Sequence, residues 1–184
     1  LLDAVKKHIK ENVDPITEEY HRLGINRKEH WGYGDGQLEL LEGAKQKAKD
    51  SGLWNFFLPD ADTGEGLSNL DYAFIANELG KNGLASETLN CSAPDTGNME
   101  VLERVGTPEQ KEQWLKPLLN GEIRSAFAMT EPGLPSSDAK NICTQAKLEG
   151  DEWVINGEKY YISGAGDPRC KVMITMVPVS YTHL

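Results

Sequence analysis

The spacing of apolar residues changes at Asn120-Gly121, and this change constrains the fold more than any other feature of the sequence. Before it, apolar residues recur every three or four positions, which is typical of amphipathic helices. After it, short β-branched and aromatic runs are separated by turn residues, which indicates strands. A helical part followed by consecutive strands predicts an α+β protein with a helical domain, 1–122, and a strand domain, 123–177.

Capping residues mark the helices of the first part. Thr107-Pro108-Glu109-Gln110 predicts a helix start, because it has an N-cap hydroxyl, a first-turn proline and a glutamine three residues after the cap. Ser68 begins another helix in a similar way, and Pro15 predicts a kink in the first one. The helices predicted from these signals and from apolar spacing are 3–22, 38–50, 68–79, 97–104 and 107–119.

The second part predicts a truncated antiparallel, barrel-like domain. Asn156-Gly157 is typical of a two-residue hairpin turn. Because the last strand would leave an unpaired sheet edge, we expect the domain to be cut short and residues 178–184 to be a non-native tail. The chain begins with Leu1 rather than Met, so we also expect its natural beginning to lie upstream. The predicted strands are 123–130, 142–149, 152–156, 158–163 and 171–177.

Charge and composition argue against several classes of function. The 184 residues carry a formal net charge of −10, and their lysines and arginines are interleaved with carboxylates, so nucleic-acid binding is not expected. No apolar run approaches the roughly 20 residues that span a bilayer. The three cysteines and four histidines lack metal-ligand spacing, so neither a metal site nor a disulfide framework is expected.

The run from Phe127 to Asp138 carries the clearest chemical signal. It joins the end of an apolar strand to a turn rich in Gly, Pro and Ser. A strand end can hold a flat polar ring through its main chain, and such a turn lets backbone N–H groups approach phosphate oxygens closely. The run therefore suits a dinucleotide. Its residues alone favour the alternative, a plain connection between two strands.

A second run, 154–164, changes this balance. Val154-Ile155-Asn156-Gly157-Glu158-Lys159-Tyr160-Tyr161-Ile162-Ser163-Gly164, after the first run, closely resembles the flavin-binding middle domain of the acyl-CoA dehydrogenase family. The resemblance covers nearly all of residues 1 to 175. It implies a helical N-terminal domain, a barrel-like middle domain and FAD as the cofactor. The Ala93–Glu100 run and the Ser136-Ser137 spacing resemble the branch whose longer members carry a phosphotransferase-like domain upstream of the dehydrogenase.

The resemblance also implies roles for single residues. The Thr130 hydroxyl would lie at the pyrimidine side of the flavin, and Ser137 would contact both the pyrophosphate and the bound acyl-CoA. Tyr161 takes the place of a Trp against the flavin ring, and Ser163 that of a Thr whose hydroxyl faces flavin N5. No residue matches the catalytic base, which the family supplies from its C-terminal domain. The expected cofactor contacts are Phe127, Ala128, Met129, Thr130, Glu131, Pro132, Gly133, Leu134, Pro135, Ser136, Ser137, Tyr161, Ile162 and Ser163.

Structural roles are alternatives for several of these residues. One of Tyr160 and Tyr161 would face the core if both lie on a strand, and Ser163-Gly164 would then be only a turn. Asp95 and Asn98 either cap a helix or line the acyl pocket. Glu131 is expected to be structural rather than catalytic.

The favoured hypothesis is a fragment of an FAD-dependent acyl-CoA dehydrogenase, inactive by itself. The full-length parent would oxidise a fatty acyl-CoA substrate, reduce an electron-transferring flavoprotein and form a homo-oligomer. One alternative is an acyl-CoA oxidase-like flavoenzyme in which the reduced flavin reacts with oxygen. The other is a non-catalytic helical binding module. The expected compartment is the bacterial cytoplasm, with a mitochondrial or peroxisomal location as the alternative.

Overall fold

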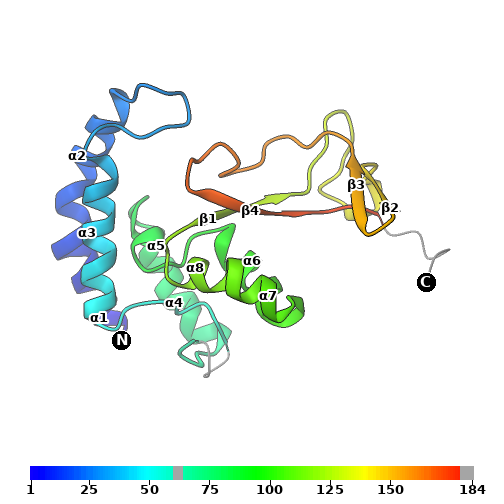
Figure 1. Cartoon of the computed structure of the whole chain (residues 1–184). Coiled ribbons are helices and arrows are strands. Elements are labelled where there is room, and N and C mark those ends of the chain that lie inside the picture. Colours follow the sequence, from blue (N-terminus) through cyan, green and yellow to red (C-terminus); the bar gives the residue numbers. More distant parts are fainter. Residues whose placement is uncertain (60–63, 179–184) are drawn as a thin grey trace. The chain divides into compact units, whose positions relative to one another are not determined.

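The chain folds into a helical unit, Leu1–Glu122, and a second unit, Ile123–Leu184, which contains the strands (Figure 1). The computed structural model describes residues 1–59 and 64–178. The α+β class predicted from the sequence is confirmed. The predicted non-native tail, 178–184, lies outside the described residues apart from Pro178. Across 1–59 and 64–178, no helix is long and apolar enough to cross a membrane.

The helices of the first unit follow the predicted capping signals. Thr107 forms the expected capping box, because its side chain accepts from the Gln110 N–H and the Gln110 side chain accepts from the Thr107 N–H. Ser68 likewise accepts from the Asp71 N–H. The short α5 was not predicted. The helices are α1 (Leu2–His8), α2 (Asp14–Ile25), α3 (Gln37–Asp50), α4 (Asn69–Leu79), α5 (Ala85–Thr88), α6 (Asp95–Val105), α7 (Pro108–Gln110) and α8 (Lys116–Leu119).

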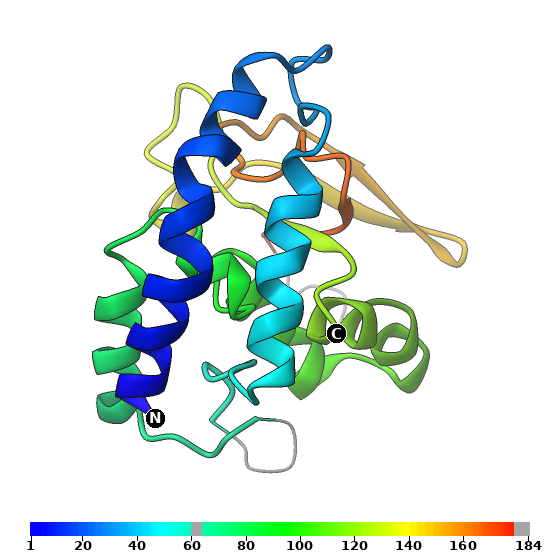
Figure 2. The same ribbon diagram turned by 90° about the vertical axis from the view of Figure 1, so that its left-hand side faces the viewer.

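Two of the helical rods contain a wider, π-helical turn just ahead of a proline. The turn Ile9–Val13 joins α1 to α2, and the turn Lys111–Leu115 joins α7 to α8. Pro15 and Pro117 follow these turns and cannot donate a backbone hydrogen bond, so the wider turn accommodates the break in the pattern. The sequence predicts a kink at Pro15, and the structure shows a π-helical turn just ahead of it instead, so that the rod stays continuous. Figure 2 shows that rod running beside α3.

The core of the helical unit is mainly aliphatic. Val5 and Val13 from the first rod are fully buried, as is Leu41 from α3. Leu79 of α4 and Met99 of α6 are no more than 1% exposed. Because these side chains come from several helices at helical spacing, the core stabilises each helix through its packed face rather than through intrinsic propensity.

Side chains from distant segments bind the last carbonyl groups of α8 and those of the two residues that follow it, at 118–121. Lys45 and Lys49 of α3 each donate to one of these carbonyls at 2.6 Å, and Trp54 Nε1 donates to another at 2.7 Å. A helix C-terminus leaves its last carbonyls without intrahelical partners and carries partial negative charge, so amide, indole and ammonium donors are suited to it. These contacts fix the end of the helical unit.

Two asparagines in the left-handed region complete this cluster. Asn55 has φ 58° and Asn90 has φ 56°, a conformation that asparagine tolerates better than most residues. The Asn90 side-chain amide donates to Asn55 Oδ1 at 2.7 Å, to Leu118 O at 2.9 Å and to Leu119 O at 3.2 Å. Asn90 therefore links the two strained positions to the end of α8.

The strands of the second unit form two separate two-stranded sheets. Strand β1 (Arg124–Ala128) pairs in parallel with β4 (Cys170–Thr175), with Phe127 opposite Ile174. Strand β2 (Gln145–Glu149) pairs antiparallel with β3 (Glu152–Asn156). The expectation of antiparallel pairing throughout is thus wrong for β1 and β4. No closed barrel forms among the described strands.

Two local expectations are also wrong. Residues 158–163 do not form a strand, because they pair with no ladder and Tyr161 has φ 54°. Asn156-Gly157 does not close a hairpin, since neither residue has the positive φ that a type I′ turn requires. The β2–β3 turn instead contains Gly150, with φ 65°. Gly157 serves close packing, because a Cβ there would lie 2.5 Å from the Thr144 hydroxyl oxygen.

We expect Asn90→Ala to destabilise the helical unit by about 2–3 kcal/mol, because it removes several partly buried hydrogen bonds and places alanine at a positive φ. Asn90→Gly should cost about 1 kcal/mol less, because glycine accepts that backbone conformation. Urea unfolding of the three proteins measures both differences. Equal losses for the two variants would show that backbone strain at residue 90 contributes nothing.

Candidate functional site

Four hydrogen bonds join the end of β1 to the segment around Tyr160. The Tyr160 N–H donates to Thr130 O at 3.0 Å, and the Thr130 hydroxyl donates to Tyr160 O at 2.6 Å. Lys159 Nζ donates to Met129 O at 2.9 Å and to Glu131 Oε1 at 2.8 Å. We call these four bonds between 129–131 and 159–160 the clasp. They bring together the two runs that the sequence placed at one site.

Glu131 has a buried, fully paired carboxylate. The residue is 4% exposed. Its Oε2 accepts from the Cys143 N–H at 2.7 Å, and its Oε1 accepts from the Thr144 N–H at 2.8 Å and from the Thr144 hydroxyl at 2.5 Å, besides Lys159. The hydrogen bond from Lys159, followed by that from the Thr144 hydroxyl, lowers the pKa of Glu131 to about 2. Glu131 therefore holds three segments together as an anion, which agrees with a structural role.

The turn after β1 separates its two serines. Ser136 is 2% exposed, and its hydroxyl oxygen accepts from the Glu131 N–H at 2.5 Å. Ser137 is exposed, and so are Pro132, Leu134 and Pro135. Gly133 has φ 74°, and no atom lies within 4 Å of the position that a Cβ would occupy there. The buried Ser136 hydroxyl thus stabilises the turn, while the outer side of the turn, including Ser137, is exposed and accessible to a ligand.

Tyr161 presents its ring to solvent from a strained backbone. It is 88% exposed at φ 54°, and its ring lies 4.4 Å from that of Tyr160, centroid to centroid. Tyr160 is itself 38% exposed, so neither ring lies in the core. A bulky residue at positive φ persists only where its surroundings fix it, and such positions cluster at functional sites. Tyr161 is therefore a candidate for contact with a flat ligand.

The remaining predicted residues lie around these features. Phe127 and Met129 are half-buried, whereas Ala128 is buried and its carbonyl accepts from Met176 N–H at 2.9 Å. Ile162 is half-buried. Ser163 is exposed in a turn closed by Ala165 N–H and Ile162 O at 3.2 Å.

Asp95 and Asn98 lie in the helical unit, near the start of α6. Both are 2% exposed. The N-cap position belongs to Pro94, which has no side-chain cap, so neither residue is an N-cap.

Lys159 and Thr144 are functional candidates that the sequence reading missed. Lys159 lies within the second run, and it would be a candidate partner for Glu131 if Glu131 were known to be buried, because a buried carboxylate needs a cation or other donors. Its partner lies 28 residues away in the chain, and that of Thr144 lies 13 away, so local spacing does not reveal either pair.

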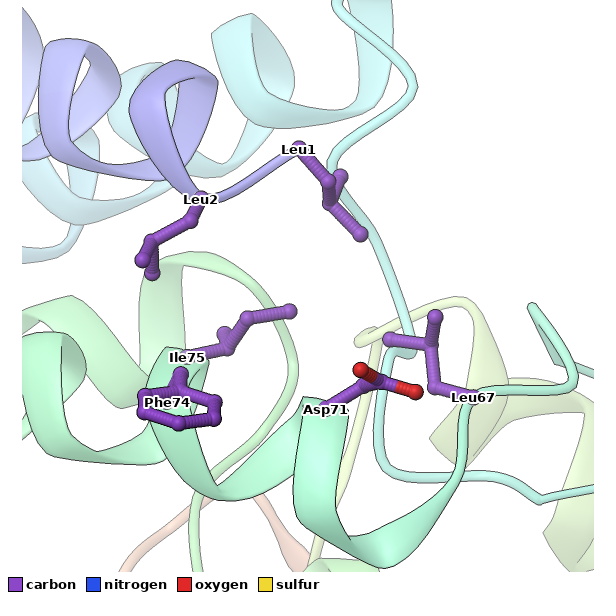
Figure 3. A pocket seen from close by; sticks show the side chains of 6 residues that line it. All are labelled: Leu1, Leu2, Leu67, Asp71, Phe74 and Ile75. Carbon is purple, nitrogen blue, oxygen red and sulfur yellow. The ribbon is translucent and has the colours of Figure 1, made fainter.

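A groove of about 240 Å³ occupies a different place, within the helical unit. Figure 3 shows Leu1, Leu67 and Ile75 turned toward a common space, with the Asp71 carboxylate at one side. The lining is mainly aliphatic. None of the residues predicted to contact a cofactor lines this groove.

Known sequence families match this chain in two places. The profile "Acyl-CoA dehydrogenase, N-terminal domain" matches residues 1–122, and "Acyl-CoA dehydrogenase, middle domain" matches residues 126–183. Acyl-CoA dehydrogenase family member 11 of Gallus gallus is 50% identical over 179 residues. The match covers 96% of this chain and 22% of that relative's length.

Solved structures show the same relationship. One from Mycobacterium abscessus, named as an acyl-CoA dehydrogenase, is 46% identical with a TM-score of 0.83 and is matched over 94% of this chain and 43% of its own. An acyl-CoA dehydrogenase complexed with FAD from Bacillus anthracis is 25% identical with a TM-score of 0.63, over 95% of this chain and 27% of its own. This chain therefore spans less than half the length of each of these proteins.

We expect the stability difference between wild type and Glu131→Gln to depend on pH. The folded pKa of Glu131 lies below its ordinary value of 4.5, so the anion stabilises the fold fully above about pH 4.5 and progressively less as the pH falls toward about 2. Urea unfolding at pH 7 and at pH 3, followed by circular dichroism, measures the difference. Glu158→Gln, at an exposed carboxylate, is the control. A difference that stays constant with pH would refute the anionic role.

The two serines should differ in their contribution to stability. Ser136→Ala leaves the buried Glu131 N–H without its acceptor and should cost about 1–3 kcal/mol. Ser137→Ala alters an exposed side chain and should cost less than about 0.5 kcal/mol. Thermal unfolding of both variants tests this, and a larger loss for Ser137→Ala would reverse the assignment of the two hydroxyls.

Proposed function

Because this chain belongs to the acyl-CoA dehydrogenase family, we propose that it supplies the N-terminal domain and part of the middle domain of an FAD-dependent enzyme. The complete protein oxidises a fatty acyl-CoA thioester between its α and β carbons. The clasp is the observation that carries this proposal. It holds the residues just after β1 against the segment that leads to Tyr161, and we expect both segments to contact the flavin.

The exposed groups near the clasp fit a flavin nucleotide. The Tyr161 ring is free to stack on a flat heterocycle. The Thr130 hydroxyl has its proton committed to Tyr160 O, so it offers lone pairs to a ring N–H. The open space at Gly133 and the exposed Ser137 hydroxyl suit phosphate oxygens. These features support the contacts expected at Thr130, Gly133, Ser137 and Tyr161; the buried Ala128, Glu131 and Ser136 offer no exposed side chain of this kind.

In this proposal, the residues of this chain bind and orient the flavin and the acyl-CoA. FAD, when bound, accepts the hydride that leaves the β carbon. Ser163, exposed two residues after Tyr161, would donate a hydrogen bond at the N5 edge, and the exposed Ser137 would border the acyl-CoA. The α proton must be removed by a base, and no residue of this chain takes that role. The family's C-terminal domain supplies it, an electron-transferring flavoprotein is the electron acceptor, and the complete enzyme is a homo-oligomer.

FAD occupancy tests this function. The purified 184-residue chain should bind FAD weakly, because the family also contacts the cofactor from a C-terminal domain. A polypeptide extended to the family's full length should retain about one FAD per chain after dialysis, seen in its visible absorbance. Adding fatty acyl-CoA without oxygen should bleach that absorbance.

Two outcomes would change the proposal. An extended polypeptide that folds but retains no flavin would refute it and favour a non-catalytic module. Hydrogen peroxide formation with acyl-CoA, at a rate unchanged by added electron-transferring flavoprotein, would indicate an oxidase. As a further check, Ser163→Ala in the extended polypeptide should slow flavin reduction by acyl-CoA about tenfold, because one hydrogen bond to the developing charge is lost.

A further inference from the structure

We propose that Lys159 is a positioning residue of the cofactor site: its ammonium group fixes the 159–161 segment against the end of β1 and so sets where the Tyr161 ring lies. The inference rests on the proposed flavin site and adds a residue to which neither the sequence motifs nor the family resemblance gave a role.

The ammonium group lies between two acceptors in the residues that directly follow β1. Lys159 Nζ is 2.9 Å from Met129 O and 2.8 Å from Glu131 Oε1, and the Lys159 side chain is 10% exposed. Charge-assisted hydrogen bonds of this kind are stronger than neutral ones, and a cation this well shielded needs such partners. Lys159 therefore has one strongly preferred position, on residues 129 and 131.

Few other contacts fix the conformation of the segment after Lys159. Residues 157–162 pair with no strand in the described part of the chain, so the clasp takes the place of a sheet ladder. Tyr160 is bonded to Thr130 through both its N–H and its carbonyl. Tyr161 follows directly with φ 54°, a conformation that is unfavourable for a bulky, non-glycine residue. The bonds of Lys159 and Thr130 therefore hold Tyr161 in this conformation.

A purely structural role for Lys159 makes a different prediction. In that case its only task is to neutralise the buried Glu131 carboxylate, and removing both charges together would restore the native arrangement. In the positioning role, the double change recovers the stability lost to the unpaired charge but not the Lys159–Met129 bond, so the segment stays loose. Lys159→Met and the Glu131→Gln/Lys159→Met double variant separate the two roles, because methionine keeps the length of the side chain without its charge.

Amide hydrogen exchange of the 184-residue chain provides the readout. The Tyr160 N–H donates to Thr130 O, so its exchange rate reports the clasp directly. We expect both variants to exchange this amide about tenfold faster or more than wild type, while the melting temperature of the double variant returns toward that of wild type. Lys147→Met, at an exposed lysine paired with Glu149 at 3.1 Å in the same unit, is the control and should change neither value.

Wild-type protection of the Tyr160 amide in the double variant would overturn the proposal, and so would unchanged exchange in Lys159→Met. If the single variant does not fold, the double variant decides alone, because it buries no unpaired charge. FAD retention by the extended polypeptide tests the proposed function separately. Where wild type retains FAD, the double variant should bind it about tenfold more weakly. Faster exchange without any wild-type flavin binding would refute the flavin function and leave the positioning of Tyr161 intact.

Discussion

The second unit depends on one buried anion, the Glu131 carboxylate. A carboxylate removed from water must be fully paired, and this one accepts from the backbone at 143–144, the Thr144 hydroxyl and the Lys159 ammonium. Its own N–H is bound by Ser136. A single side chain thus ties the end of β1 to the following turn, to the start of the β2 region and to the segment before Tyr161. Because the described strands form only two-stranded sheets, which are marginally stable alone, these contacts supply cohesion that a wider sheet would otherwise give.

The helical unit also contains acceptors that need donors, namely the backbone carbonyls at the C-terminus of α8. The last carbonyls of α8 and those just after it need donors, and Lys45, Lys49, Trp54 and Asn90 supply them from other parts of the unit. In both units, a polar element end is satisfied by side chains far away in sequence. In both units, contacts from distant segments therefore determine where the helix or strand end lies.

This division between buried support and exposed contact suits a binding site. Glu131, Ser136, Thr144 and Lys159 are largely buried and bonded to one another's segments, whereas Ser137, Tyr161 and Ser163 are exposed. Groups that meet a ligand are most effective when residues behind them restrict their movement. The exposed residues are among those that the family resemblance predicts at the flavin, and the buried ones, which include the predicted contacts Glu131 and Ser136, explain why they are held where they are.

The sequence by itself determined the α+β class, the helix starts at Ser68 and Thr107 and the family, because caps, apolar periodicity and the two motif runs are local patterns. Only the tertiary structure decided that β1 pairs in parallel with β4, and that residues 158–163 leave the strand conformation. It also decided that Lys159 bonds to Glu131 and that Ser136, not Ser137, faces inward. The physical reason is that strand partners, ion pairs and burial join residues far apart in the chain, and the energies that select them arise only when those residues meet.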